Sequence, residues 1–143
     1  MLTSTKSLRA QRARVGTPVF EPLDARLLLA IATWDGGPTG EGTDWNVAAN
    51  WAADALPAAG DDVQLVPTGT NPTITLGAPV SLNSLTSSRN LTMQTSSTLT
   101  LAAASNFAAG TTFTMAAGAL AGAGSLTIDG AMTWGGGSMS GTG

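Results

Sequence analysis

The chain has 143 residues, of which only 10% are charged, against about 25% in an ordinary globular domain, and alanine, threonine, glycine and serine make up more than half of it. Cysteine, histidine and tyrosine are absent. This composition excludes disulfide scaffolds, Cys/His zinc sites and histidine-based catalysis, and the 6 basic residues with a net charge of −3 argue against nucleic-acid binding.

Residues 1–32 form a basic leader. All basic residues of the chain except Arg89 lie within its first 26 positions. The leader ends in a short apolar run in which Ala30 and Ala32 form an A-x-A pattern, at which a signal peptidase would cut before residue 33. The run is too short for a transmembrane helix, which needs about 20 apolar residues. We interpret the leader as an export segment; a packed amphipathic helix over Leu23–Ile31 and an organelle transit peptide are the alternatives.

A recognisable motif lies inside this leader, where residues 20–29 read FEPLDARLLL. The segment resembles the bacterial LEPR-XLL motif, approximately FEPLEPRLLL, with Asp24 in place of the glutamate and Ala25 in place of the second proline. That motif occurs near the N-terminus of long, repetitive bacterial proteins. The resemblance implies export and sorting to the cell surface, and it implies no chemistry.

Residues 33–62 form a tryptophan-rich entry segment. Trp34, Trp45 and Trp51 lie here between glycine and proline clusters that predict turns. The end of a solenoid exposes an apolar face that needs covering, so we predict that these indoles form an N-terminal cap. The segment is similar to the stretch W-x-G-G…W…A-x-N-W…P-x-x-G-D-D-V that leads into a parallel β-helix in many bacterial surface proteins.

Two binding functions compete with the cap. The indole faces are suited to stacking on sugar rings, which would make this segment a small carbohydrate-binding module. Asp44, Asp61 and Asp62 carry carboxylate oxygens of the kind that Ca²⁺ prefers. Because aspartate is also a frequent turn residue, we favour turn formation for Asp61 and Asp62 and assign no metal and no cofactor.

Residues 63–143 read as short, threonine-rich strands separated by glycine, serine and asparagine. Apolar residues alternate with small or polar ones, which is the two-residue period of a β-strand. No segment has the 3.6-residue period of a long helix, and the alanine-rich run Leu101–Ala109 is not expected to be helical. The expected strands are 63–67, 73–76, 81–86, 90–94, 98–102, 112–116, 125–128 and 131–134.

A faint repeat of about 27 residues accompanies these strands, aligning Thr100 with Thr127 and Phe107 with Trp134. A period of about 27 residues is a plausible length for one turn of a solenoid, which would give roughly three turns in residues 63–143. We therefore predict an all-β fold: a right-handed parallel β-helix with the tryptophan-rich cap at its start. An antiparallel β-sandwich is the second candidate.

The C-terminal run WGGGSMSGTG has no closing helix and no charge that would protect an open β edge. We expect the chain to stop in mid-repeat, as a short gene product or as the first fragment of a longer protein. If it stands alone, we expect self-association through the open solenoid end, or loose order after residue 110.

Only Arg89 and Asp129 carry charge in residues 63–143. We interpret Arg89 as a solvated turn residue. A glycosidase needs two carboxylates at a set separation, and a polysaccharide lyase needs a carboxylate cluster with a basic residue nearby, so we name no catalytic residue.

The sequence thus predicts a non-enzymatic, exported bacterial protein of the cell surface or extracellular matrix, resembling an adhesin stalk. Cell-envelope components or polysaccharide are its expected partners, with no nucleic acid. The alternatives are the N-terminal part of a β-helix carbohydrate-active enzyme and the small tryptophan-based carbohydrate-binding module.

Overall fold

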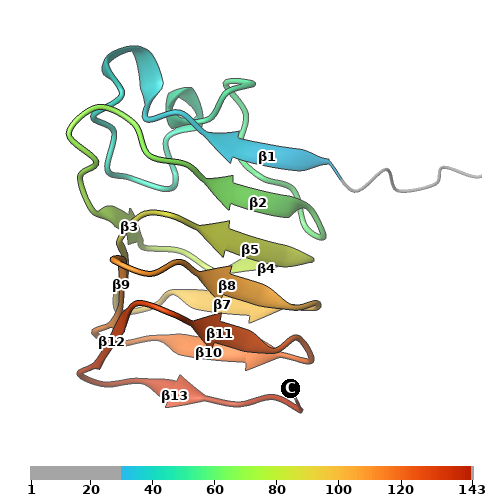
Figure 1. Ribbon diagram of the computed structural model, residues 1–143. Helices are drawn as coiled ribbons and strands as arrows, with labels where there is room; N and C mark the ends of the chain where they lie inside the picture. Colours follow the sequence, from blue (N-terminus) through green and yellow to red (C-terminus); the bar gives the residue numbers. More distant parts are fainter. Residues whose placement is uncertain (1–29, 143) are drawn as a thin grey trace, which may run out of the picture.

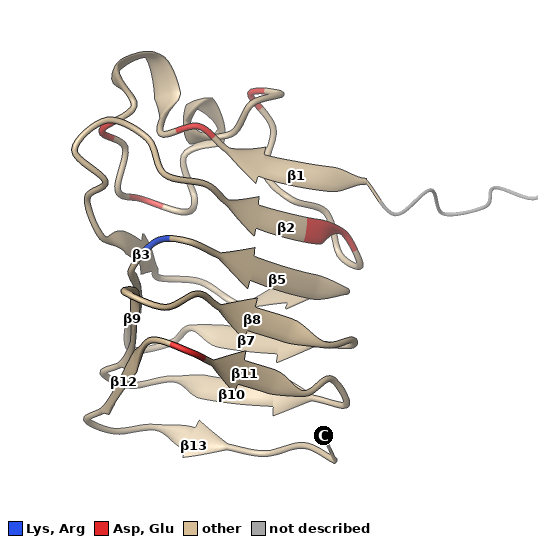
Figure 2. Cartoon of the chain, viewed as in Figure 1, with Lys and Arg blue, Asp and Glu red and all other residues tan. Residues whose placement is uncertain are grey.

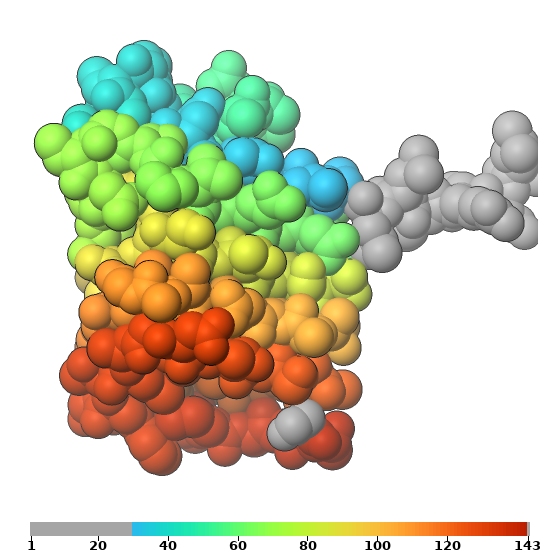
Figure 3. Space-filling view, in the orientation of Figure 1, coloured from blue at the N-terminus to red at the C-terminus, as the bar shows by residue number. Residues whose placement is uncertain are grey.

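The computed structural model describes residues 30–142, which form a column of short parallel strands (Figure 1). The chain winds upon itself as a β-solenoid of about 4 turns. The turns stack in chain order from one end of the column to the other, as the colour layers in Figure 3 show. The all-β, parallel β-helix prediction is confirmed, and because every pairing between strands is parallel, the antiparallel sandwich is wrong.

Three sheets form the faces of the column. Their orders are β1-β2-β5-β8-β11 in sheet A, β12-β9-β6-β3 in sheet B and β13-β10-β7-β4 in sheet C. From β2 onward the chain visits sheets A, B and C in turn, and we call each such set of three strands a rung. Two short 3-10 helices, η1 (Gly37–Thr39) and η2 (Ala48–Asn50), lie before β2. The strands are β1 (Ile31–Trp34), β2 (Asp62–Leu65), β3 (Ile74–Leu76), β4 (Val80–Leu82), β5 (Ser84–Ser87), β6 (Leu91–Met93), β7 (Thr98–Leu101), β8 (Ser105–Phe107), β9 (Thr112–Met115), β10 (Ala119–Gly122), β11 (Leu126–Ile128), β12 (Ala131–Trp134) and β13 (Ser138–Met139).

Alternating side chains of each strand point into the column and stack in ladders along its axis. In sheet B, Ile74 pairs with Leu91, Leu91 with Phe113 and Phe113 with Met132. The first three of these side chains are fully buried, and each such burial stabilises the fold by about 1.5–3 kcal/mol. A strand of three or four residues is stable here because it contributes its apolar side chains to a core shared with the rungs on either side.

The repeat is shorter than the 27 residues expected from the sequence. Successive sheet B partners Ile74, Leu91 and Phe113 are offset by 17 and 22 residues. Trp134 consequently pairs with Met115 and not with Phe107. The expected period was wrong for two reasons: any apolar residue can fill an inward position, and the corners between strands differ in length. The rungs therefore share the same alternation of buried and exposed positions but not the same residue types.

Most expected strands are present, but their boundaries differ. The expected strand 81–86 is two strands, β4 and β5, because the chain passes from sheet C to sheet A at Asn83. Strands β1, β8, β10 and β13 were not expected. The segment β10 reads ALAG, without β-branched or aromatic residues, and it is extended because β7 and β13 pair with its two edges.

Two adjacent rungs approach closely at Gly122, which has φ +119°. A Cβ at this position would lie 2.0 Å from the carbonyl oxygen of Leu101, its partner in β7. We expect Gly122→Ala to lower the free energy of unfolding by about 2–4 kcal/mol in urea denaturation, because backbone strain and a steric clash act together. The control is Gly110→Ala, where φ is +82° but no heavy atom lies within 4 Å; its expected cost is about 1 kcal/mol. Equal losses in the two variants would contradict the role of the close approach.

Candidate functional site

The N-terminal end of the column is closed by the tryptophan cap, which consists of Trp34, Trp45 and Trp51. Each is at most 1% exposed. The Trp51 ring meets the Trp34 and Trp45 rings edge-on, with centroids 5.0 and 4.8 Å apart, and the Trp51 Nε1–H donates to the Trp45 carbonyl oxygen at 2.9 Å. The predicted cap is confirmed. Because these indole faces are buried, they offer no surface on which a sugar ring could stack.

Of the three aspartates considered for calcium, Asp61 and Asp44 hold turns, whereas Asp62 is the first residue of strand β2, so the turn role expected for it was wrong. The Asp61 carboxylate accepts hydrogen bonds from the backbone N–H groups of Ala58 and Ala30, and Asp44 accepts one from the N–H of Asn46. Asp62 accepts from the side chains of Asn83 and Ser84 in the next rung. Among residues 30–142, no three acidic, histidine or cysteine side chains are grouped so that they could hold a metal ion.

Arg89 is fully buried, so its interpretation as a solvated turn residue was wrong. Its guanidinium donates from Nη1 to the Thr68 hydroxyl and from Nη2 to the Pro72 carbonyl oxygen at 2.6 Å. Its Cζ lies 5.8 Å from the centroid of the Trp34 ring. Arg89 occupies the corner between β5 and β6, and the long β2–β3 loop covers it. The polar neighbours of Arg89 in the sequence SSRN suggested that its side chain is exposed to solvent, but they describe only the local composition.

Arg89 connects three parts of the structure: its own rung, the β2–β3 loop and the segment that carries the tryptophan cap. Burial lowers the pKa of Arg89, and the charge of Glu41 acts against that shift. The Nε–H of Arg89 and the Nε1–H of Trp34 are both buried without an acceptor, which costs free energy. Thr68, which accepts from Arg89, itself donates to the Gly40 carbonyl oxygen at 2.9 Å. The guanidinium thus connects the corner of one rung to the segment that carries the cap.

A second link of the same kind joins Glu41 to Thr70. The Glu41 carboxylate accepts hydrogen bonds from both the hydroxyl and the backbone N–H of Thr70, and these hold the Glu41 pKa below its usual value of about 4.5. The pKa of Glu41 is lower in the folded state than in the unfolded state. The stabilisation from its bonds to Thr70 is therefore complete above the unfolded-state pKa and is lost as the pH falls through the folded-state pKa. The pKa of Asp62 is lowered in the same direction, by Ser84 and then Asn83.

We therefore expect the free energy of unfolding to fall as the pH is lowered from about 5 to about 3. Urea denaturation across this range measures the fall. Glu41→Gln should be less stable than the parent at neutral pH and should lose less stability on acidification, because one of the two responsible carboxylates is gone. An identical pH profile for the variant and the parent would contradict the Glu41 link.

The opposite end of the column is open. We call the inward side chains of the last rung, Leu126, Ile128, Met132, Trp134 and Met139, the open end. They continue the ladders of buried residues above them, yet Met132, Trp134 and Met139 are 39%, 58% and 41% exposed. Sequence reasoning noted the unprotected edge but did not identify these side chains; the alternation of Met132 and Trp134 with Thr133 was the available signal.

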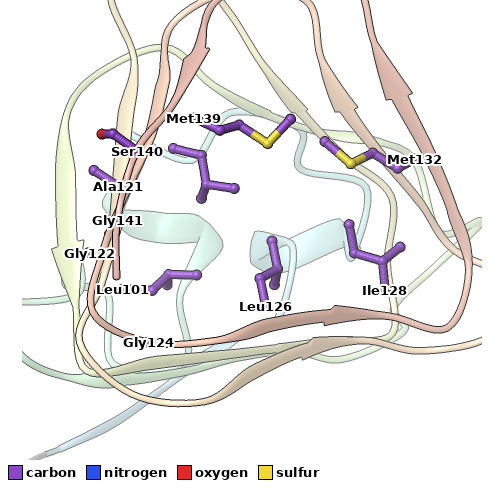
Figure 4. A pocket seen from close by; sticks show the side chains of 11 residues that line it. Leu101, Ala121, Gly122, Gly124, Leu126, Ile128, Met132, Met139, Ser140 and Gly141 are labelled. Carbon is purple, nitrogen blue, oxygen red and sulfur yellow. The ribbon is translucent and has the colours of Figure 1, made fainter. Parts of the chain in front are cut away.

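A hollow of about 400 Å³ lies at the open end. Figure 4 looks into it and shows apolar side chains pointing inward from several strands. The residues lining it are Leu101, Leu120, Ala121, Gly122, Gly124, Leu126, Ile128, Met132, Met139, Ser140 and Gly141. Ser140 supplies the only polar side chain of this lining, and none is charged. The hollow is thus suited to receive apolar side chains.

Asp129 lies near the last rung but does not belong to the hollow. Its carboxylate accepts a hydrogen bond from the Asn106 Nδ2 at 2.8 Å. Asn106 is the middle residue of β8, between inward-facing Ser105 and Phe107, so this pair lies on the outer face of sheet A. Arg89 and Asp129, the two charged residues beyond residue 62, lie apart along the column, as Figure 2 shows. Arg89 is buried, and Asp129 is exposed.

No protein-family model, curated protein or solved structure matches the chain. In the described part of the chain, none of the helices is long and apolar enough to span a bilayer.

Proposed function

We propose that the chain is a non-enzymatic structural protein, exported to the cell surface or extracellular matrix, where it serves as an adhesin-like β-solenoid stalk. The observation that carries this proposal is that buried apolar ladders run from the closed tryptophan cap to an open end of the same apolar character. A column closed at one end and open at the other accepts further β-structure in one direction, as the base of a rod requires.

The outer faces support a mechanical role. Beyond residue 62, Arg89 and Asp129 are the only charged residues; one is buried and the other is bonded to Asn106. The outward positions of the strands are mainly threonine, serine, asparagine and alanine. Such faces provide weak polar contacts repeated along the column, which suits binding to polysaccharide or to other cell-envelope components by many small interactions.

Export rests on the leader, whose LEPR-XLL-like segment lies outside the described residues. The A-x-A pattern reaches the structure at β1, where Ile31 pairs with Asp62 and Ala32 with Val63. The bond between Ala32 and Thr33 is thus inside a strand. Cleavage there would leave only Thr33 and Trp34 to pair with β2.

A comparison of two start points measures this effect. We expect a chain that begins at Thr33 to be less stable than one that begins at Ala30 by about 1–3 kcal/mol, because it loses two strand pairs and the bond from the Asp62 N–H to the Ala30 carbonyl oxygen. Urea denaturation followed by circular dichroism gives the difference. Equal stability would show that β1 needs only its last two residues.

Production of the full chain in a bacterial host tests the proposed function. The protein is expected in the surface or extracellular fraction, with a processed N-terminus by mass spectrometry. An intact Met1 on a cytoplasmic product would contradict export. Release of oligosaccharides from envelope polysaccharide by the purified protein would favour the β-helix enzyme instead.

A further inference from the structure

We propose that the tryptophan cap locks the processing site of the leader, so that a signal peptidase cuts between Ala32 and Thr33 only before the chain has folded around this bond. The inference rests on the export included in the proposed function and adds a control to it, because removal of the leader must then precede folding. The reaction is a hydrolysis. Water adds across the peptide bond, which leaves a carboxylate on Ala32 and an ammonium group on Thr33.

One edge of β1 is covered by β2. The two strands run side by side in parallel, with Ala32 paired to Val63 (Figure 1). The Asp62 N–H donates to the Ala30 carbonyl oxygen at 3.0 Å, and the Ala30 N–H donates to the Asp61 carboxylate at 3.3 Å. A protease takes up its substrate as an extended segment whose main-chain groups pair with the enzyme. On this edge of β1 those groups already have partners within the column.

The other edge of β1 is occupied just beyond the bond that would be cut. The Ala52 N–H donates to the Thr33 carbonyl oxygen at 2.9 Å. The next residue, Trp34, forms an antiparallel bridge with Trp51. The backbone that follows the bond is therefore held between two segments, and neither edge is free to pair with an enzyme.

The side chains around the bond are turned away from an enzyme as well. A signal peptidase recognises small residues at the first and third positions before the bond it cuts, which are Ala32 and Ala30. Ala32 is partly buried and packs against the apolar core, whereas its neighbour Ile31 points outward and is 62% exposed. The side chain directly before the bond is thus enclosed by the folded chain.

Trp34 connects this bond to the cap. It lies two residues after the bond and is fully buried, with its ring centroid 5.0 Å from that of Trp51 and 5.8 Å from the Cζ of Arg89. Lifting β1 away from the column withdraws this indole from both neighbours. The opening that exposes the bond is therefore the opening that dismantles the cap, and the rate of cutting should follow the population of the open form.

This coupling sets an order of events. A chain that meets the peptidase before folding loses its leader, and the remaining residues then fold around Thr33. A chain that folds first keeps its leader, because the cap has enclosed the bond. Folding thus decides between two products of one sequence.

Incubation of the purified, folded full chain with a bacterial signal peptidase in detergent micelles tests the lock. A synthetic peptide of residues 20–40 serves as the unfolded reference for the same bond. We expect the peptide to be cut between Ala32 and Thr33, and the folded chain to be cut at least about a hundredfold more slowly. Mass spectrometry of the products over time gives both rates.

Two full-length variants test whether the cap is responsible. Trp51→Ala removes the indole that bridges to β1 and should be cut at least about tenfold faster than the parent, because more of the chain is open. The matched control is Trp134→Ala, which removes the same side chain from the other end of the column and should stay within about fivefold of the parent rate. If Trp51→Ala does not fold, it should be cut as fast as the peptide, and the ratio of peptide to parent remains the test.

The outcomes separate the lock from export. Cutting of the folded parent as fast as the peptide, or equal rates for the two tryptophan variants, would overturn the lock and leave export intact. A peptide that is not cut, or is cut at another bond, would overturn the processing site and the lock with it. The localisation experiment decides export independently of either result.

Discussion

Replacement of Trp51 by alanine is expected to lower the free energy of unfolding by about 3–5 kcal/mol, the usual cost of removing a large buried aromatic side chain. Trp51 lies at the centre of the tryptophan cap, with edge-on contacts to Trp34 and Trp45. Its loss would leave a cavity above the first rung and would also leave the Trp45 carbonyl oxygen without the bond from the indole N–H. Urea denaturation followed by far-ultraviolet circular dichroism measures the change without relying on tryptophan emission.

Two control variants separate the causes of this loss. Trp51→Phe keeps most of the aromatic packing but removes the N–H donor, and we expect a smaller loss of about 1–2 kcal/mol. Trp134→Ala removes the same side chain from the exposed open end and should cost less than about 1 kcal/mol in the monomer. If Trp51→Ala were as mild as Trp134→Ala, the N-terminal indoles would not function as a cap.

The second large effect is expected at Arg89. Arg89→Ala should lower the free energy of unfolding by about 3–4 kcal/mol, because it opens a cavity beside Trp34 and leaves two partly buried acceptors, on Thr68 and Pro72, without their donors. The same denaturation experiment measures it. Hydrogen exchange should also show faster exchange in the segments that Arg89 connects, residues 66–73 and 36–42.

Arg89→Met distinguishes packing from charge. Methionine keeps an unbranched stem of similar length and removes a buried charge whose Nε–H has no acceptor, so it regains desolvation free energy while losing the two bonds. We expect a loss of about 1–2 kcal/mol, clearly less than for alanine. A methionine variant as unstable as the alanine variant would show that the two hydrogen bonds, and not the packing of the stem, carry the effect.

Both variants act on the closed end of the column. At the other end of the described residues, Met132, Trp134 and Met139 are partly exposed, so the two ends differ in how well their apolar side chains are covered. The low charge of the strands also removes one usual protection of an exposed β edge.

The pattern of residues along the chain was enough to predict the fold class and the cap. Alternation of apolar with small residues predicts strands, and abundant small residues permit the tight corners that a solenoid needs. Three tryptophans before the first full rung predicted how one end is closed, and their burial confirms it. These predictions held because they depend on local pattern: a side chain on a strand alternates between two faces whatever the strand is paired with.

The length of a rung, the burial of Arg89 and the exposure of the last rung depend on how distant segments pair and pack in space. Strand pairing places Trp134 below Met115. The segment ALAG has little intrinsic preference for a strand, and it is extended because the neighbouring rungs form hydrogen bonds with its backbone. Arg89 is buried because a loop 17–21 residues earlier in the chain folds over it. Burial of this kind depends on which distant segments meet in space, and the local order of residues does not encode it.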